Sequence, residues 1–318
     1  MQLCTTILPL VASFSAMLVL RPISYWLALA VAPIAAGFFI RTFILMHDCA
    51  HGSFTPSRRA NEIIGFWTGV LTLMPFGQWR RDHAIHHASS GDLDRRGFGD
   101  IDTLTIDEYL ARNWWGRFKY RAFRNPLVLF GGGPFYFLLL QRFQTPGATH
   151  GGKRMQSVYL TNAAIALVYG SMFFAFGTWT MLSLFMPVYY LATSVGIFLF
   201  YVQHQFEGTY WETHSSWNYG TAALQGSSYY RLPKVLEWIT GSIGLHHVHH
   251  TDPKIPNYML RRCHEASEDF RSVPELTLLS SLRSVKLKLW DPQQRRLVGF
   301  DAVAGKTRGK QQRSAQLS

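Results

Sequence analysis

Histidine is concentrated in three short segments of the sequence. The segment HDCAH begins at His47, HAIHH begins at His83, and HHVHH begins at His246. Residues three and four apart lie on one face of a helix, so each segment can direct two or three imidazoles toward one point. The candidate metal ligands in these segments are His47, His51, His83, His86, His87, His246, His249 and His250.

His204 joins this set because it ends a long apolar stretch, in the segment YVQHQFE, that leads back toward the third histidine segment. Nine imidazoles are too many for one four-coordinate ion, whereas two metal ions with about five ligands each would use them all. With an unperturbed pKa of about 6.5, histidine is mostly neutral near pH 7 and can bind a metal. Nitrogen-rich sites suit iron, zinc, copper or nickel, and composition leaves that choice open.

Other interpretations of these segments remain open. A single HxxxH pattern is weak evidence for a metal, but two HxxHH segments beside it are strong evidence. HDCAH also resembles the HExxH motif of zinc proteases, with Asp48 in place of the glutamate base, although a protease would leave the other segments unused. A metal transporter would carry its ligands within helices near the bilayer midplane, whereas these histidines lie at or beyond helix ends.

The remaining histidines are expected to have ordinary roles. His247 directly follows His246 and therefore faces another side of a helix. His150, His214 and His264 have no partner at helical spacing, so we expect polar or capping roles for them.

Four apolar segments are long enough to position these histidines at a membrane. Residues 3–20, 24–46, 157–176 and 178–203 each approach the roughly 20 residues that a spanning helix needs. The first could be a secretory signal, but no basic residue precedes its apolar run and no clear cleavage site follows it, so we expect it to remain. Residues 62–77 and 126–140 are shorter, which favours interfacial or re-entrant segments.

The distribution of charge predicts an orientation. Of the turns between paired spans, one holds only Arg21 and the other, around Gly177, holds no charge, whereas nearly every other Lys and Arg lies on the opposite side. By the positive-inside rule, both termini and all the histidine segments are cytoplasmic, in a multi-pass protein of the inner (cytoplasmic) membrane. The net charge of +12 then suits anionic headgroups or an acidic protein partner, and no nucleic acid.

Acidic residues near the histidines could orient them. Carboxylates that do not bind the metal themselves often accept a hydrogen bond from the distal nitrogen of a ligand histidine. The candidates are Asp92, Asp94, Asp100, Asp102, Glu207 and Asp252, and the alternative for the first four is a solvated acidic loop that balances Arg95 and Arg96. The three cysteines show no paired pattern, so neither disulfides nor a thiolate site is expected. Residues 1–290 are expected to form one domain, followed by a disordered basic tail at 291–318.

At this point the chain resembles integral-membrane fatty acid desaturases of the bacterial acyl-lipid type. The matching segments are HDCAHGSF (47–54), QWRRDHAIHHASSGDLDRRGFGDIDTLT (78–105), YVQHQFEGTYWE (201–212) and GLHHVHHTDPKIPNYMLRRCHE (244–265). The resemblance implies an all-α membrane protein, with four transmembrane helices and a cytosolic helical cap that holds two iron ions. It assigns all nine candidate histidines as ligands. Animal relatives have an asparagine where this chain has Phe200, so any water-mediated tenth contact would come from another residue or be absent.

The implied reaction removes two hydrogens from adjacent methylenes of a lipid-linked acyl chain, leaving a cis double bond. Reduction of O2 to two waters takes four electrons, two from the substrate and two from a donor. The chain shows no dinucleotide fingerprint, cysteine cluster or fused haem domain, so a separate donor is implied, with a ferredoxin-like carrier expected first. A hydroxylase or ketolase with the same metals, and a non-redox zinc protein, remain alternatives. The position of the double bond and the acyl carrier are left open.

Overall fold

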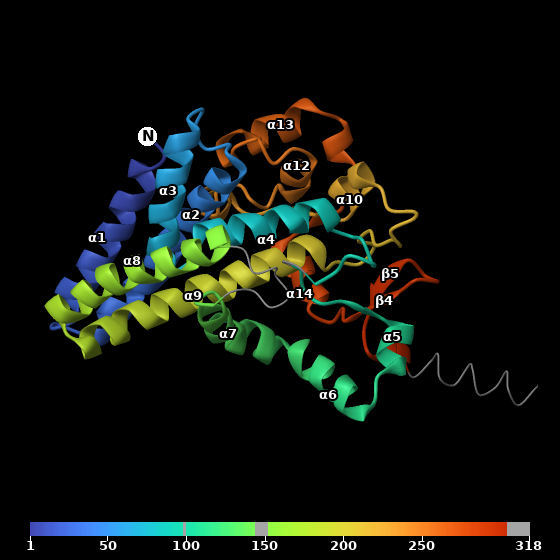
Figure 1. Ribbon diagram of the computed structural model, residues 1–318, viewed down its shortest axis with the longest axis horizontal. Helices are drawn as coiled ribbons and strands as arrows, with labels where there is room; N and C mark the ends of the chain where they lie inside the picture. Colours follow the sequence, from blue (N-terminus) through green and yellow to red (C-terminus); the bar gives the residue numbers. More distant parts are fainter. Residues whose placement is uncertain (98–99, 144–151, 304–318) are drawn as a thin grey trace, which may run out of the picture.

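The computed structural model describes residues 1–97, 100–143 and 152–303, and helices dominate it (Figure 1). The four long helices are α1 (Cys4–Leu20), α2 (Tyr25–His51), α8 (Gly152–Phe176) and α9 (Thr178–His204). The shorter helices are α3 (Arg58–Leu71), α4 (Phe76–Ser89), α5 (Ile106–Ala111), α6 (Trp114–Phe123), the π-helix η1 (Leu127–Gly132), α7 (Gly133–Leu140), α10 (Tyr219–Gln225), α11 (Lys234–Ile239), α12 (His246–Thr251), the 3-10 helix η2 (Asn257–Met259), α13 (Leu260–Ala266), the 3-10 helix η3 (Asp269–Arg271) and α14 (Leu278–Ser284).

Within the described residues, three helices are long and apolar enough to cross a membrane. They are Tyr25–His51, Met155–Phe176 and Thr178–His204, and they coincide with three of the four expected spans. The fourth expected span corresponds to α1, which is apolar but has only 17 residues. A span perpendicular to the bilayer needs roughly 20 residues, so the crossing by α1 stays a prediction.

The two short apolar segments form broken helices instead of long ones. Residues 62–77 contain the end of α3, a tight turn and the start of α4. Residues 126–140 form η1 and α7, which pack against α9, where Ser194 donates to the Phe130 carbonyl at 2.9 Å and Tyr189 donates to the Pro134 carbonyl at 3.2 Å. Gly133 permits this approach, because a Cβ there would lie 3.2 Å from Ile197.

The fold is mostly helical, as expected, and a few strands of two or three residues accompany the helices. β1 (Leu104–Thr105) pairs in parallel with β4 (Leu289–Asp291), and β4 pairs in antiparallel with β5 (Arg296–Val298). β2 (Tyr229–Tyr230) pairs in parallel with β3 (Glu275–Leu276). The expected disordered tail from residue 291 is therefore wrong for residues 291–303, because RRLVGF carries apolar residues that the hairpin buries, with Leu297 only 1% exposed. Residues 304–318 lie outside the described residues.

The core joins the long helices and directs their ends to one side of the molecule. A cluster of buried residues on α1, α2 and α9 includes Ala32, Ala35, Phe185 and Val188. The small alanines on α2 let neighbouring helices approach closely, as is common in membrane bundles. The helices α4 and α12 lie beside the ends of α2 and α9, with α12 between α10 and α13 (Figure 1).

A buried arginine ties the end of α9 to the hairpin. Arg124 is fully buried, and its Nη2 donates to Gln205 Oε1 at 2.7 Å and to the Leu287 carbonyl at 3.0 Å. Its Nη1 donates to the Asp102 carbonyl at 3.1 Å. Gln205 directly follows His204, so this network holds the last turn of α9 and the loop after α4 in one arrangement.

Candidate metal centre

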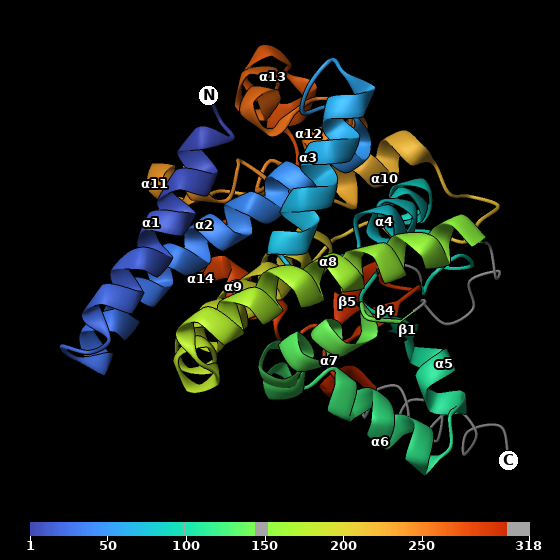
Figure 2. The same ribbon diagram turned by 60° about the vertical axis from the view of Figure 1, so that its left-hand side comes forward.

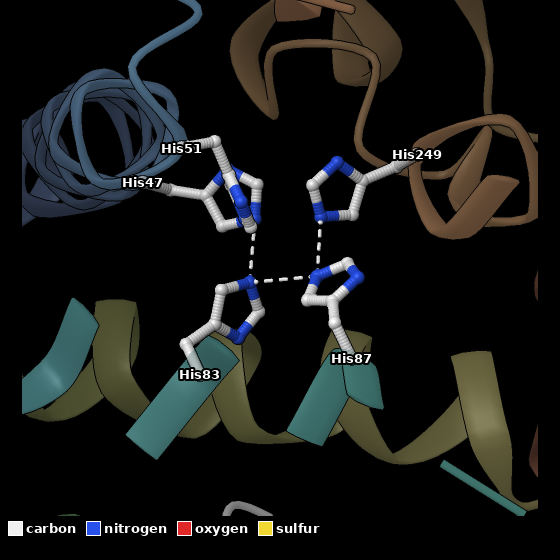
Figure 3. Close-up of side chains that lie close together, drawn as sticks. All are labelled: His47, His51, His83, His87 and His249. Atoms are coloured by element: carbon white, nitrogen blue, oxygen red, sulfur yellow. Dashed lines mark hydrogen bonds between the residues drawn. The ribbon is translucent and has the colours of Figure 1, made fainter. Parts of the chain in front are cut away.

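The nine candidate histidines converge in two groups at the ends of the long helices. One group holds five imidazoles and the other holds four, and within each group the ligand nitrogens lie within 4.8 Å of one another. The five are His47, His51, His83, His87 and His249 (Figure 3), and the four are His86, His204, His246 and His250.

Helical spacing explains how the segments divide between the groups. His47 and His51 on α2, like His83 and His87 on α4, are four residues apart and stay together in the five-histidine group. His246 and His250 on α12 are likewise four apart and stay together in the four-histidine group. The histidine that lies three residues after the first in each HxxHH segment, His86 or His249, joins the opposite group. The second and third segments therefore each supply both groups.

The end of α2 depends on a glycine. Gly52 has a φ of 69°, and its N–H bonds to the carbonyls of Asp48 and Cys49. This left-handed cap ends the helix directly after His51, since glycine adopts positive φ without a steric cost. The two histidines of the first segment therefore lie in the last two turns of α2.

The five-histidine group presents Nε2 atoms to a common centre. The Nε2 of His83 lies 3.1 Å from that of His47 and 3.1 Å from that of His87. The Nε2 of His87 lies 3.0 Å from that of His249. The Nε2 of His51 is buried without a hydrogen-bond partner among the described residues.

The four-histidine group repeats this geometry. The Nε2 of His204 lies 3.2 Å from that of His86 and 2.9 Å from that of His246. The Nε2 of His250 lies 3.1 Å from that of His246. All four side chains come from α4, α9 and α12, and all four residues are buried.

Hydrogen bonding alone does not explain these contacts. One Nε2 atom carries either a single proton or a single lone pair, yet those of His83 and His204 each face two other nitrogens at close range. Two nitrogens that bind one metal at about 2.1 Å and at right angles are about 3.0 Å apart. The observed separations match that value, so each group could hold a metal ion.

Burial keeps five of these imidazoles neutral. Their pKa values fall well below the ordinary value, first because burial disfavours the charged ring and then because neighbouring imidazoles repel a proton; the five are His83, His87, His246, His249 and His250. A neutral ring retains the lone pair that a metal needs.

The distal nitrogens of three histidines have acceptors that fix their tautomer. His86 Nδ1 lies 2.6 Å from Asp100 Oδ1. His204 Nδ1 lies 3.1 Å from the Gly226 carbonyl, and His47 Nδ1 lies 3.2 Å from Asp48 Oδ1. A proton on Nδ1 leaves the lone pair of Nε2 directed into the group, as is typical of metal-binding histidines.

Of the six acids expected near the site, one takes that role in the described structure. Asp100 contacts His86, but Asp92 accepts from Arg95 and His214, and Asp94 accepts from the backbone of His214. The backbone carbonyl of Asp102 accepts from Arg124. Glu207 forms a surface ion pair with Arg296, and Asp252 accepts from the backbone of Lys254. Sequence proximity was therefore a poor guide to which carboxylate contacts a ligand histidine.

Asp48 has a role that the sequence did not reveal. Its Oδ2 accepts from both the backbone N and the side-chain Nδ2 of Asn257, each at 2.7 Å. A carboxylate held this way is not free to activate a water, which argues against the protease interpretation. Asn257 lies in KIPNY, which begins four residues after the third histidine segment ends, and only this proximity could have drawn attention to it.

The other histidines behave differently from the nine. His247 is buried and points away, with its Nε2 3.0 Å from His264 Nδ1, and burial followed by the charge of His264 lowers its pKa to about 3. His264 therefore has a partner that its sequence spacing did not predict. His214 lies at the surface against Asp92. His150 lies outside the described residues.

Two aromatic residues line the site. The Trp79 ring stacks on His83 with centroids 4.3 Å apart. Phe200 lies against both His86 and His204, with ring centroids 5.2 Å and 5.3 Å away. An apolar ring therefore occupies this side of the four-histidine group.

Long apolar helices that carry two polyhistidine groups able to hold metal ions are typical of one class of membrane enzymes, and the comparisons specify the family. The sequence profile of the family "Fatty acid desaturase" matches residues 24–275. A "Fatty acid desaturase" of Bacillus subtilis (strain 168) is 45% identical over 303 residues, which cover 95% of this chain and 86% of that protein. The chain therefore belongs to the fatty acid desaturase family and is an oxidoreductase.

More distant relatives are similar over less of their length. The "sn-1 acyl-lipid omega-3 desaturase (ferredoxin)" of Synechocystis sp. is 28% identical over 72% of this chain and 64% of its own length. The chloroplastic omega-3 fatty acid desaturase of Brassica napus is 27% identical over 76% of this chain and 61% of its own length. This chain thus spans less than two thirds of either of these two relatives.

Proposed function

We propose that this chain inserts a cis double bond into a lipid-linked fatty acyl chain, using O2, two iron ions and electrons from a separate carrier. The observation that carries the proposal is the division of nine imidazoles into a group of five and a group of four, each with nitrogens within 4.8 Å. Nitrogen donors in this number suit two redox metals better than one four-coordinate zinc ion.

The balance of the reaction defines what the site must supply. Removing two hydrogens from adjacent methylenes yields two electrons and two protons, and O2 needs four electrons and four protons to form two waters. The carrier supplies the remaining two electrons, and two protons come from water. Iron, when bound, supplies the redox chemistry that breaks unactivated C–H bonds, whereas zinc has none.

The residues of this chain hold and shield such a pair of ions. The histidines would bind the ions through the lone pairs of Nε2. Asp100, Asp48 and the Gly226 carbonyl accept the Nδ1 protons of three of these histidines and fix the orientation of their rings. Phe200 closes one side of the four-histidine group with apolar surface. A site closed to water limits side reactions of reactive oxygen species.

The contact between Arg41 and Trp238 supports a position for the membrane surface near this level of α2. Arg41 is buried on α2, its guanidinium donates to the Trp238 carbonyl, and it lies over the Trp238 ring at 4.2 Å. Arg and Trp are typical of the membrane interface. From Tyr25 to Arg41 the helix rises about 24 Å at 1.5 Å per residue, close to the roughly 30 Å of a hydrocarbon core.

Exposed apolar residues on two short helices support the same position of the membrane surface. Val235 and Trp238 on α11 are 75% and 46% exposed, and Trp114 on α6 is 76% exposed. Figure 2 shows α11 beside α1 and α2, and α6 below α7. The histidine groups then lie beyond the bilayer, on the side that the positive-inside rule makes cytoplasmic, and α1 completes four spans.

The electron carrier is a small acidic redox protein, and ferredoxin is the first candidate. The net charge of +12 includes exposed Arg58, Arg59 and Lys254 on the side of the molecule that carries the histidines. Complementary charge mainly accelerates the association of such partners. The Synechocystis relative, which carries both "acyl-lipid" and "ferredoxin" in its name, supports the substrate class and the carrier.

The test combines metal content with product analysis. We expect the purified protein to hold about two irons, and cells that express it with a ferredoxin system to gain unsaturated acyl chains, located by mass spectrometry. His86→Ala and His249→Ala should each lose iron and activity, while the control His214→Ala, outside both groups, should keep both. Stoichiometric zinc without iron, or unchanged lipids, would overturn the proposal, and hydroxylated or oxo products would identify the runner-up reaction.

A further inference from the structure

A small cavity lies directly behind the four-histidine group. Its volume is about 10 Å³, and its lining includes Asp100, His204, Thr209 and Gly226. A buried water needs about 10–15 Å³ when a cavity is measured with a water-sized sphere. The cavity therefore has room for one water and for no larger ligand.

Two of the residues that line this cavity each have a buried polar atom without a hydrogen-bond partner among the described residues. These atoms are Asp100 Oδ2 and Thr209 Oγ1. The Asp100 side chain is 7% exposed and Thr209 is 2% exposed, so bulk solvent does not satisfy either atom. Buried polar groups in native proteins are almost always hydrogen-bonded to protein or to ordered water.

We infer that one ordered water occupies this cavity and joins Thr209 to Asp100. The Thr209 hydroxyl donates to the water, and the water donates to Asp100 Oδ2. Buried waters usually make about three hydrogen bonds. Gly226 lines the same cavity, and its carbonyl has a second lone pair beside the one that His204 uses.

The backbone is closely packed at two glycines that line the cavity. A Cβ at Gly226 would lie 2.5 Å from the Ala222 carbonyl oxygen, and a Cβ at Gly91 would lie 2.9 Å from the Tyr210 carbonyl oxygen. Gly91 also has a φ of 77°, which disfavours other residues. The walls on these sides are closely packed, so the water site is built into the fold.

The water would act on the four-histidine group alone. Asp100 Oδ1 holds His86 at 2.6 Å, so a water on Oδ2 fixes the carboxylate that orients this ring. The same water lies beside the carbonyl that holds His204. Thr209 is thus a positioning residue, and this inference rests on the proposed metal binding by these histidines.

The test compares Thr209→Val, which keeps the shape but removes the hydroxyl, with Thr209→Ser, which keeps the hydroxyl. Iron enriched in ⁵⁷Fe is followed by Mössbauer spectroscopy during challenge with a chelator. Outer partners of metal ligands change affinity about 10- to 100-fold. We expect Thr209→Val to lose one of the two iron signals at least about tenfold faster, and Thr209→Ser to resemble the unmodified chain.

Equal retention by Thr209→Val and the unmodified chain would overturn the inference while leaving the two-iron proposal intact. A chain that holds no iron, or one whose iron survives His86→Ala, would instead overturn the proposed metal site. If Thr209→Val fails to fold, an experimental density map of the unmodified holoprotein decides. Density for a water within hydrogen-bond distance of Asp100 Oδ2 and Thr209 Oγ1 supports the inference, and well-resolved density without it refutes the inference.

Discussion

Asp48 and Asn257, 209 residues apart in sequence, are joined by two hydrogen bonds of 2.7 Å to a single carboxylate oxygen. The other oxygen of Asp48 lies 3.2 Å from His47 Nδ1. The end of α2 and the segment after α12 are therefore connected through a group that also orients a candidate ligand. This connection holds the first and third histidine segments in a fixed position relative to each other.

Removing the Asn257 side-chain amide should lower the stability of the protein and weaken metal binding by the five-histidine group. We expect Asn257→Ala to cost about 1–3 kcal/mol of stability, because the buried Oδ2 atom of Asp48 then keeps only the backbone donor of residue 257. Iron affinity should fall about 10- to 100-fold, because His47 loses its fixed orientation. Chelator competition and chemical unfolding in detergent measure the two effects, and the neighbouring exposed residue Tyr258, changed to Phe, is the control. Equal effects of both changes would contradict this role.

Replacing the Asp100 carboxylate by a neutral amide should weaken metal binding by the four-histidine group. Asp100→Asn keeps the shape but can present an amide N–H to His86 Nδ1, which favours the wrong tautomer of the ring. We expect loss of iron from the four-histidine group and at least about tenfold lower desaturation. Asp94→Asn, in the same loop but bonded to the backbone of His214, should leave both unchanged. Similar behaviour of the two variants would show that the Asp100 contact is unimportant.

The ion pair between Arg96 and Glu108 should make stability depend on acid pH. Burial alone would raise the pKa of Glu108, but hydrogen bonds from Arg96 and from Thr105 outweigh it and lower the pKa to about 2. Because the folded pKa lies below the ordinary value of 4.5, the stabilisation is fully present above that value and is lost as pH falls toward about 2.

Thermal unfolding at several pH values measures this effect. The difference in melting temperature between the unmodified chain and Glu108→Gln should be largest above pH 5 and should shrink toward pH 2. Glu207→Gln, at a more exposed and longer ion pair with Arg296, should show a smaller difference at every pH. A difference for Glu108→Gln that stays constant with pH would refute the assignment.

The hairpin of β4 and β5 should contribute to stability, contrary to a disordered tail. Leu297 is 1% exposed and packs with Trp290, Trp211 and Leu93. We expect Leu297→Ala to cost about 2–5 kcal/mol, as is usual for a buried leucine, whereas the exposed neighbour Arg296, changed to Ala, should cost less than about 1 kcal/mol. Denaturant unfolding measures the loss of stability in each variant. If Leu297→Ala leaves the stability unchanged, residues 291–303 would have to be regarded as a disordered tail.

The sequence by itself determined which residues could meet. Helical spacing placed pairs such as His83 and His87 on one face, and apolar runs of about 20 residues located the three long helices. These properties are local, since they depend only on the rise and rotation of a helix. The family resemblance also followed from contiguous segments, and the comparisons confirm it.

Only the tertiary structure decided how the nine histidines divide and what supports them. His86 belongs to the four-histidine group, although its segment neighbours His83 and His87 belong to the group of five. His249 belongs to the group of five, because the crossing of α4 and α12 determines which imidazoles face each other. Asn257 and Gly226 support the site through contacts with residues distant in sequence, while Asp92 and Asp252, though near the ligands in sequence, bond to other groups. Spacing along one helix carries no information about the angle at which a second helix packs.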